Sequence, residues 1–283
     1  MKKIIWISSF PKSGNTWVRI FLSNYFYNKS KSYDPKYLGY IPKFPLKKDL
    51  ELVSNKLKTV ANINNISSFW IECQKVIAKA HGDVVFLKNH NALLKINGKD
   101  FTNESFSLAS IYIVRDPRDV VVSYANWLNL SIDQIIQKIV MSDLDNLFYL
   151  KSTKNPNDLE VYSSWKIHYL SWKNGMNTIP KIIIKYEDLI NDAEKTLEKL
   201  LVFLKEIMNF NIDTELFKLS IENSDFKKLQ DHEKKFGFRE NSERKTNFFR
   251  SGKTKQWIKI LNQNQINIIE KTFHDEMKEL GYI

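Results

Sequence analysis

The N-terminal segment joins a short apolar run, a loop of small and polar residues, and a helical pattern. Residues 3–8 are mostly β-branched or aromatic, which is typical of a buried strand. Residues 9–15 include Ser, Pro, Gly and Asn, which favour a tight loop. From residue 16 to about residue 27, apolar side chains recur at helical spacing. This order of elements predicts an anion site, because free backbone N–H groups and the positive end of the helix dipole meet at the loop.

Side chains of the loop add to this binding capacity. Lys12 contributes a positive charge, and Ser13 and Thr16 contribute hydroxyl donors. A Walker A motif has a Gly, four further residues and then Gly-Lys-Ser/Thr. Here Lys12 precedes Gly14, and the loop has no earlier Gly. Taken alone, the segment is therefore a phosphate site of another kind, or a plain strand-to-helix connection with an incidental lysine.

Charge and cysteine content limit the partners and the compartment. A length of 283 residues permits one large α/β domain or two small ones. The formal net charge of +11 favours anionic ligands. The sequence has no arginine-rich stripe of the kind that would predict nucleic-acid binding. Cys73 is the only cysteine, so no internal disulfide can form. It lies on the apolar face of a predicted helix, as expected for an inert thiol.

Targeting and membrane signals are not evident in the sequence. The apolar run after the N-terminal lysines is too short for a signal peptide, and Pro11 and Lys12 interrupt it. No stretch approaches the ~20 apolar residues that a transmembrane helix needs. We therefore expect a cytoplasmic protein.

Short apolar runs separated by helical patterns predict the fold class. The predicted strands are residues 3–8, 84–87, 110–114 and 181–186. The predicted helices are residues 16–27, 47–60, 67–80, 119–130, 131–141, 157–175, 191–207 and 213–222. This alternation is typical of a parallel sheet covered by helices on both faces. We expect an α/β fold whose central, mostly parallel sheet has four to five strands, within a single domain spanning residues 1–283.

Reactive side chains follow each predicted strand. In strand order they are Lys12; Lys88 and His90; Arg115; and Tyr186, Glu187 and Asp188. In an open α/β sheet, ligands bind at the edge formed by the carboxyl ends of the strands. We therefore expect these side chains to gather around one ligand.

Three segments resemble motifs of the PAPS-dependent sulfotransferase family, which uses 3′-phosphoadenosine 5′-phosphosulfate (PAPS). Residues 11–17 (PKSGNTW) resemble the 5′-phosphosulfate loop of the family. Residues 113–124 (IVRDPRDVVVSY) are similar to its 3′-phosphate motif, and residues 249–257 (FRSGKTKQW) to its Arg-Lys-Gly-x-x-Gly-Asp-Trp segment. The resemblance implies a P-loop-NTPase-like three-layer fold, PAPS as co-substrate, adenosine 3′,5′-bisphosphate (PAP) as product, and no metal.

The third segment departs from the family pattern. Ser251, Lys255 and Gln256 stand where the family has Lys, Gly and Asp. The Arg, the first Gly and the Trp keep their spacing. Because of the substitutions, the sequence does not determine the conformation of the loop at residues 253–256. An alternative register at residues 244–245 (Arg-Lys) lacks a following Gly.

The resemblance also implies which residues hold the nucleotide. A guanidinium such as that of Arg115 binds a phosphate bidentately, and the hydroxyl of Ser123 supplies a further donor. Flat aromatic rings hold an adenine with few hydrogen bonds. The full implied set is Lys12, Ser13, Gly14, Asn15, Thr16, Trp17, Arg115, Ser123, Tyr186, Phe226, Arg250, Ser251 and Gly252. Taken singly, Arg115 also fits a surface ion pair, and Tyr186 and Phe226 also fit the protein interior.

By the same resemblance, the catalytic residues are His90, Lys12 and Lys88. The sequence FLKNH matches the family pattern in which a His after a strand is the general base, and the ordinary pKa of His suits that role. Lys12 would neutralise the leaving phosphate, and Lys88 would stabilise the transferring sulfonyl group. The remaining histidines are expected to be surface or structural residues: His81, His168, His232 and His274.

The acceptor and the oligomeric state stay open. No motif is evident in residues 28–80 and 124–175, which are expected to build the acceptor pocket. The candidate lining residues, for which core packing is an equal alternative, are Trp70, Trp127, Phe148 and Tyr149. A lipid, a saccharide, a small phenol or alcohol, an amine and a peptide tyrosine are all compatible. The alternative functions are an ATP-dependent P-loop kinase and a non-catalytic anion- or polysaccharide-binding module.

Overall fold

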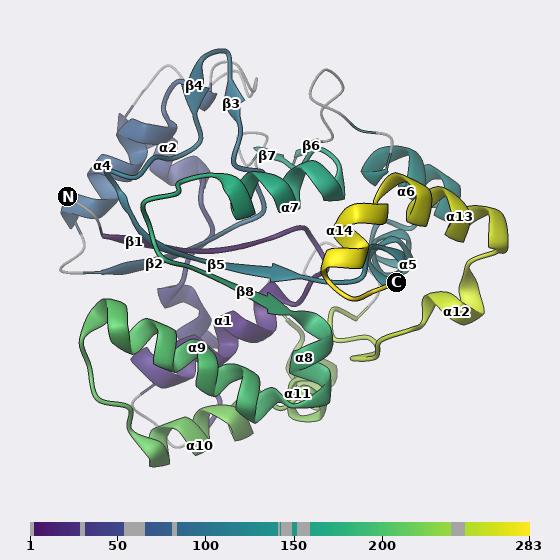
Figure 1. Cartoon of the computed structure of the whole chain (residues 1–283). Coiled ribbons are helices and arrows are strands. Elements are labelled where there is room, and N and C mark those ends of the chain that lie inside the picture. The colour runs from purple at the N-terminus through teal and green to yellow at the C-terminus, as the bar shows by residue number, and fades with distance from the viewer. Residues whose placement is uncertain are drawn as a thin grey trace. The chain divides into compact units, whose positions relative to one another are not determined.

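The computed structural model has the predicted α/β character (Figure 1). It describes residues 3–28, 32–53, 66–80, 84–140, 142, 149–151, 159–238 and 247–283. The chain divides into two compact units, and each is considered by itself. The first unit comprises Met1–Phe10, Ile41–Val114 and Ser142–Ile183. The second unit comprises Pro11–Tyr40, Arg115–Met141 and Ile184–Ile283. The single domain inferred from the sequence stays a prediction.

A four-stranded sheet, with the order β2-β1-β5-β8, contains the four predicted strands. Its members are β1 (Ile4–Ser9), β2 (Val85–Asn89), β5 (Ser107–Val114) and β8 (Lys181–Lys185). β1 pairs in parallel with both β2 and β5, and Trp6 lies opposite Leu87 on one side and Ser110 on the other. All six residues of β1 are buried, as expected for an apolar strand between two neighbours. The α/β class and the mostly parallel sheet are therefore confirmed.

Residues 42–44 add a short strand-like pairing beside β2. The N–H of Lys88 donates to the Pro42 carbonyl at 2.9 Å, and the N–H of Phe44 donates to the Lys88 carbonyl at 2.7 Å. Lys43 and Lys88 form a parallel bridge. This pairing places the two lysines side by side.

Two hairpins were not expected from the sequence. In one, β3 (Lys95–Ile96) pairs with β4 (Lys99–Asp100) through Asn97 and Gly98, which both have positive φ. Asn-Gly is the pair that a type I′ hairpin turn favours. In the other, β6 (Tyr149–Lys151) pairs with β7 (Leu159–Val161).

The β6–β7 hairpin corrects the predicted helix over residues 157–175. Residues 159–161 are a strand, and α7 begins only at Trp165 and ends at Asn174. Ser164 has extended backbone, and its side chain accepts from the N–H of Ile167, so it caps the helix. The apolar pattern of the sequence continues through strand β7 and the cap, so this pattern does not reveal the boundary between β7 and α7.

The other helices of the first unit are α2 (Lys47–Val53) and α4 (Trp70–Ala80). The helix predicted over residues 47–60 is present to residue 53, and its remainder lies outside the described residues. The sequence predicts a helix to about Ala80 with its cap at Ser67 and Ser68, and helix α4 begins at Trp70 and ends at Ala80. Helix α7 packs against β1 and β5.

The second unit is largely helical. Its helices are α1 (Asn15–Tyr27), η1 (Pro35–Tyr40), α5 (Pro117–Leu128), α6 (Ile132–Ile139), α8 (Tyr186–Asn191), α9 (Ala193–Met208), α10 (Thr214–Asn223), α11 (Phe226–Phe236), α12 (Trp257–Ile260), α13 (Gln263–Thr272) and α14 (His274–Glu279). Asp116 caps α5 with Pro117 at its first position, and Ser131 forms a capping box on α6. Among the described residues, no helix has both the length and the apolar character needed to cross a bilayer.

Trp6 is the centre of the aromatic core of the first unit. Its ring lies 5.3 Å from Phe101, 5.6 Å from Phe44 and 6.3 Å from Trp172, measured between centroids. Its indole N–H donates to the Ser107 hydroxyl at 2.9 Å. The side chain is fully buried and has its one donor satisfied, so it contributes both packing and a hydrogen bond.

We expect Trp6→Ala to lower the free energy of unfolding by ~3–5 kcal/mol, because it leaves a large cavity that the neighbouring rings cannot fill. Denaturant unfolding of the purified protein measures this change. Phe236→Ala is the control, since that ring is 75% exposed and its loss should cost less than ~0.5 kcal/mol. Equal losses for the two variants would contradict this assignment of the core.

Candidate functional site

The loop at residues 11–14 has an unusual backbone that brings it against Tyr186. Lys12 has φ 68° and Gly14 has φ 100°, so two residues of the loop have positive φ. Gly14 is the N-cap of α1. A Cβ at Gly14 would lie 2.7 Å from Cδ2 of Tyr186, a distance that real Cβ contacts do not reach. The positive φ at residue 14 and the close approach of the Tyr186 ring therefore both require a glycine at this position.

The polar side chains of this loop are buried. Ser13 is fully buried, and Asn15 and Thr16 are less than 10% exposed. The Ser13 hydroxyl has no hydrogen-bond partner within the described part of the chain. A buried polar atom without a partner is costly, and this one lies beside the first turn of α1, where backbone N–H groups lack helical partners. The loop thus fits a ligand that brings hydrogen-bond acceptors.

Lys12 lies among aromatic rings in this structure. Its ammonium nitrogen is 4.5 Å from the centroid of Phe248 and 5.3 Å from that of Trp127. Both distances are within the range of cation–π attraction.

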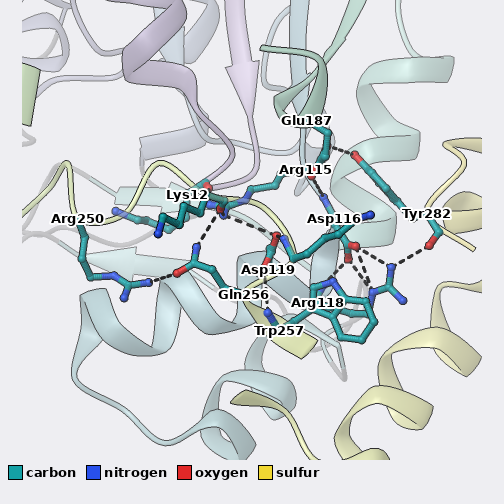
Figure 2. A network of polar contacts seen from close by, with 12 residues as sticks. Lys12, Arg115, Asp116, Arg118, Asp119, Glu187, Arg250, Gln256, Trp257 and Tyr282 are labelled. Carbon is teal, nitrogen blue, oxygen red and sulfur yellow. Dashed lines mark hydrogen bonds and ion pairs between the residues drawn. The ribbon is translucent and has the colours of Figure 1, made fainter. Parts of the chain in front are cut away.

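Arg115 connects three of the predicted segments (Figure 2). Its Nη1 donates to the carbonyl of Lys12 at 3.1 Å, and its Nη2 donates to the carbonyl of Lys253 at 3.0 Å. The guanidinium carbon lies 4.3 Å from the ring centroid of Tyr186. Arg115 is 5% exposed. One buried side chain therefore joins the first loop, residues 113–124 and the segment at residues 249–257.

Asp119 fastens the segment at residues 249–257 to helix α5. Its carboxylate accepts from the N–H of Lys255 at 2.7 Å and from that of Trp257 at 3.2 Å. It also lies 3.9 Å from the Arg115 guanidinium. Burial raises the pKa of Asp119, while Arg115 and the two N–H donors oppose that rise.

Lys255 and Gln256, which depart from the family pattern, have defined conformations and contacts. Lys255 has φ 58°, so a lysine here adopts the left-handed conformation that a glycine favours. Gln256 accepts from Nη2 of Arg250 at 2.9 Å and donates to the carbonyl of Lys253 at 2.9 Å. The segment therefore has a defined turn despite the two substitutions.

Three aromatic rings of the implied set lie next to one another. Trp17 meets Tyr186 at 6.2 Å and Phe226 at 6.4 Å between centroids, in both cases edge to face. A Cβ at Gly252 would lie 2.6 Å from the Phe226 ring, so this glycine is also required by a close approach. Of the remaining predicted residues, Ser123 and Ser251 are half-buried and Arg250 is exposed.

Arg118 and Tyr282 were not anticipated from the sequence, whereas Glu187 was expected only as one of the side chains that follow the fourth strand. Glu187 accepts from the N–H of Asp116 at 3.1 Å and from the Tyr282 hydroxyl at 2.9 Å. Arg118 pairs with Asp116 and donates to the carbonyl of Tyr282 at 2.8 Å. These contacts hold the C-terminal segment against residues 116–118 (Figure 2). Apart from the pair of Arg118 with Asp116, they join positions 71 to 164 residues apart, so no local pattern reveals them.

In the first unit, His90 has a defined tautomer. Its Nδ1 lies 2.8 Å from the carbonyl of Ser9, and a carbonyl can only accept, so Nδ1 carries the proton. Nε2 therefore keeps its lone pair and is able to take up a proton. Burial lowers the pKa of His90 well below 6.5, and the nearby charge of Lys88 adds to this effect.

Glu160, in β7, is a buried carboxylate beside Lys88 and His90. It accepts from the N–H of His90 at 3.2 Å and pairs with Lys88 at 3.6 Å and Lys43 at 3.1 Å. Burial alone would raise the pKa of Glu160, but Lys43 and Lys88 outweigh it and the pKa is lowered. Neither Glu160 nor Lys43 was expected from the sequence. The one local signal is a carboxylate within the apolar run at residues 159–162.

The other predicted residues have varied settings. His168 is fully buried and therefore not a surface residue; its Nε2 lies 3.0 Å from the His90 carbonyl, and burial lowers its pKa to about 4. Trp70 is buried in the core, and Trp127 stacks on Tyr124. His232 is half-buried and His274 exposed. The predictions that lie outside the described residues, or outside the described side chains, concern His81, Phe148, Tyr149, Arg244 and Lys245.

We expect Gly14→Ala to destabilise the protein by at least ~1 kcal/mol more than Gly98→Ala. Both glycines have positive φ, but a Cβ at Gly98 would meet no atom within 4 Å, whereas one at Gly14 would strike Tyr186. Chemical denaturation of both variants measures the difference. Equal losses of stability in the two variants would show that the ring of Tyr186 moves aside without a cost in free energy.

Comparisons with known proteins agree with this geometry. The model of the sulfotransferase domain family matches residues 2–281. Sulfotransferase 2A1 of Macaca fascicularis is 24% identical over 282 residues, which cover 97% of this chain and 84% of that protein. Retinol dehydratase in complex with androsterone and the inactive cofactor PAP has a similar fold, with a TM-score of 0.60, 15% identity, and coverage of 97% of this chain and 80% of that one. Mouse sulfotransferase SULT7A1 complexed with PAP gives a TM-score of 0.56 at 18% identity, over 98% of this chain and 85% of that one. This chain belongs to the sulfotransferase domain family.

Proposed function

We propose that this chain transfers the sulfonyl group of PAPS to a hydroxyl or amine group of a small-molecule acceptor. The observation that carries the proposal is the buried guanidinium of Arg115, which joins the first loop to the segment at residues 249–257. Both segments are those in which the family resemblance locates the phosphates. The relatives in the two structural comparisons above hold PAP, which supports the same nucleotide for this chain.

In this proposal the two ends of the nucleotide have separate binding groups. The 5′-phosphosulfate is held by the first loop, where the Ser13 hydroxyl is buried without a partner among the described residues. The residues assigned to it are Lys12, Ser13, Gly14, Asn15 and Thr16. The 3′-phosphate is held by Arg115, Ser123, Arg250, Ser251 and Gly252. The adenine is held by Trp17, Tyr186 and Phe226, whose rings are adjacent.

The chemistry follows from the charges and the tautomer. PAPS supplies an activated sulfonyl group attached to its 5′-phosphate. His90 takes the proton of the acceptor on Nε2, since Nδ1 is held by the Ser9 carbonyl. Lys12 neutralises charge on the leaving phosphate, and Lys88 neutralises charge on the transferring group.

The acceptor, in this proposal, is a small hydroxylated molecule. Structures of retinol dehydratase contain androsterone in one case and retinol in another, both with PAP. A cytoplasmic location, a metal-free reaction and the absence of nucleic-acid binding stay predictions of the sequence.

The decisive experiment incubates the purified protein with labelled PAPS and a panel of alcohols, phenols, amines, saccharides and tyrosine peptides. We expect acceptor-dependent release of PAP. Parallel titrations compare PAP with ATP and magnesium; tighter binding of ATP would favour a kinase. Binding of polyanions that depends on salt alone, without turnover of any acceptor, would favour an anion-binding module.

We expect Arg115→Ala to weaken PAP binding by about 10- to 100-fold, because a charge-assisted contact to the phosphate is lost. Arg115→Lys keeps the charge without the planar fork, so its loss should be intermediate. Isothermal titration with PAP measures both variants. Unchanged affinity in Arg115→Ala would remove this residue from the 3′-phosphate site.

We expect His90→Ala to lower kcat by about 10²–10⁴-fold while PAP affinity is unchanged. His274→Ala, at an exposed histidine, is the matched control. Because the pKa of His90 is lowered, its imidazole stays neutral below pH 6.5. The acid limb of kcat/KM for the wild type should therefore lie below pH 6.5, and an acid limb above that value would contradict the role of His90.

A further inference from the structure

One face of helix α11 contacts the backbone of residues 248–252. Phe226, Gln230 and Glu233 stand at positions i, i+4 and i+7 of this helix, a spacing that places them on the same side. None of the sequence motifs described above includes Gln230 or Glu233. Their contacts with the segment at residues 249–257 are therefore visible only in the structure.

The two polar side chains of this face bind consecutive backbone groups. The carboxylate of Glu233 accepts from the N–H of Phe248 at 2.6 Å and from the N–H of Phe249 at 2.8 Å. The side-chain amide of Gln230 donates to the carbonyl of Phe249 at 2.8 Å and to that of Arg250 at 3.1 Å. Two N–H groups and two carbonyls in succession are thus bound, which fixes the direction of the main chain at residue 250.

Aromatic contacts hold the chain on either side of residue 250. Phe249 is buried, and its ring meets Phe226 edge to face at 5.9 Å between centroids. The ring of Phe226 also lies against Gly252, where a Cβ would be 2.6 Å from it. Arg250 lies between these two contacts in the chain, so its backbone is held although its side chain is exposed.

The side chain of Arg250 continues this network toward Arg115 (Figure 2). Its Nη2 donates to Oε1 of Gln256 at 2.9 Å, and Nε2 of Gln256 donates to the carbonyl of Lys253 at 2.9 Å. The same carbonyl accepts from Nη2 of Arg115 at 3.0 Å. The two arginines that the proposed function assigns to the 3′-phosphate are therefore linked through one carbonyl.

We infer that Gln230 and Glu233 are positioning residues, which fix the backbone at Arg250 so that its guanidinium is directed to the 3′-phosphate of the nucleotide. This inference rests on the proposed function and deepens it. Neither residue contacts the nucleotide in this account, and both act through residue 250. An arginine on an untethered loop would lose conformational entropy on binding a phosphate, and fastening its backbone beforehand removes part of that cost.

Titrations that compare PAP with adenosine 5′-monophosphate test the inference, because the second nucleotide lacks only the 3′-phosphate. In Gln230→Leu the two carbonyls lose their donor. We expect PAP affinity to fall about three- to tenfold, while the affinity for adenosine 5′-monophosphate stays within about twofold. Glu233→Gln replaces one acceptor by a donor, and the same pattern is expected. Gln263→Leu, the same substitution at an exposed glutamine of α13, is the matched control and should leave both affinities unchanged.

Two outcomes separate positioning from a purely structural role. A structural loss would weaken both nucleotides equally, and that result would overturn the inference, as would unchanged PAP affinity in Gln230→Leu. In the background of Arg250→Ala, Gln230→Leu should lower PAP affinity by less than about twofold, since the group through which it acts is gone. An undiminished loss in that background would also overturn the inference. If Gln230→Leu does not fold, Gln230→Ala is used with the same expectations.

The wild-type protein distinguishes a failure of this inference from a failure of the proposed function. A wild type that binds PAP no more tightly than adenosine 5′-monophosphate would refute the 3′-phosphate site of the proposed function itself. A wild type that prefers PAP, together with Gln230 variants that keep the same preference, would refute this inference alone.

Discussion

The contacts among distant segments of the second unit depend on the position of one buried guanidinium. Arg115 is 5% exposed, and such a charge is stable only where its donors find acceptors. Two of those acceptors are backbone carbonyls at Lys12 and Lys253, which are 241 residues apart in the chain. Main-chain acceptors cannot rotate away, so the loops and the guanidinium fix one another. Asp119 extends this mutual support by holding two N–H groups of the later segment.

Local patterns predicted the elements that carry Arg115 and the first loop. The four apolar runs correspond to the four strands of the sheet, because a short run of apolar, β-branched residues is recognised without information from distant parts of the chain. Gly14 was identifiable because few residue types suit a tight loop between a strand and a helix. The family resemblance implied nucleotide-binding roles for Arg115, Phe226 and Gly252, and the structure places Phe226 against Gly252 and Arg115 beside Tyr186.

The remainder depends on contacts between distant parts of the chain. Glu160 lies in a hairpin strand that apolar periodicity assigned to a helix, and its partners come from residues 43, 88 and 90. Tyr282 reaches Glu187 across 95 residues. Lys255 adopts a left-handed turn that its residue type disfavours, because two backbone hydrogen bonds to Asp119 outweigh the local preference. Tertiary contacts of this kind leave no trace in the local sequence.

The contact between Gly14 and Tyr186 has a consequence for how this protein can evolve. The ring of Tyr186 occupies the space that any side chain at residue 14 would need. The same ring covers Arg115 and meets Trp17, so it cannot shrink without exposing both. Variation at residue 14 is therefore limited twice, by its positive φ and by the ring of Tyr186, so a smaller ring at residue 186 would not by itself make room for a side chain there.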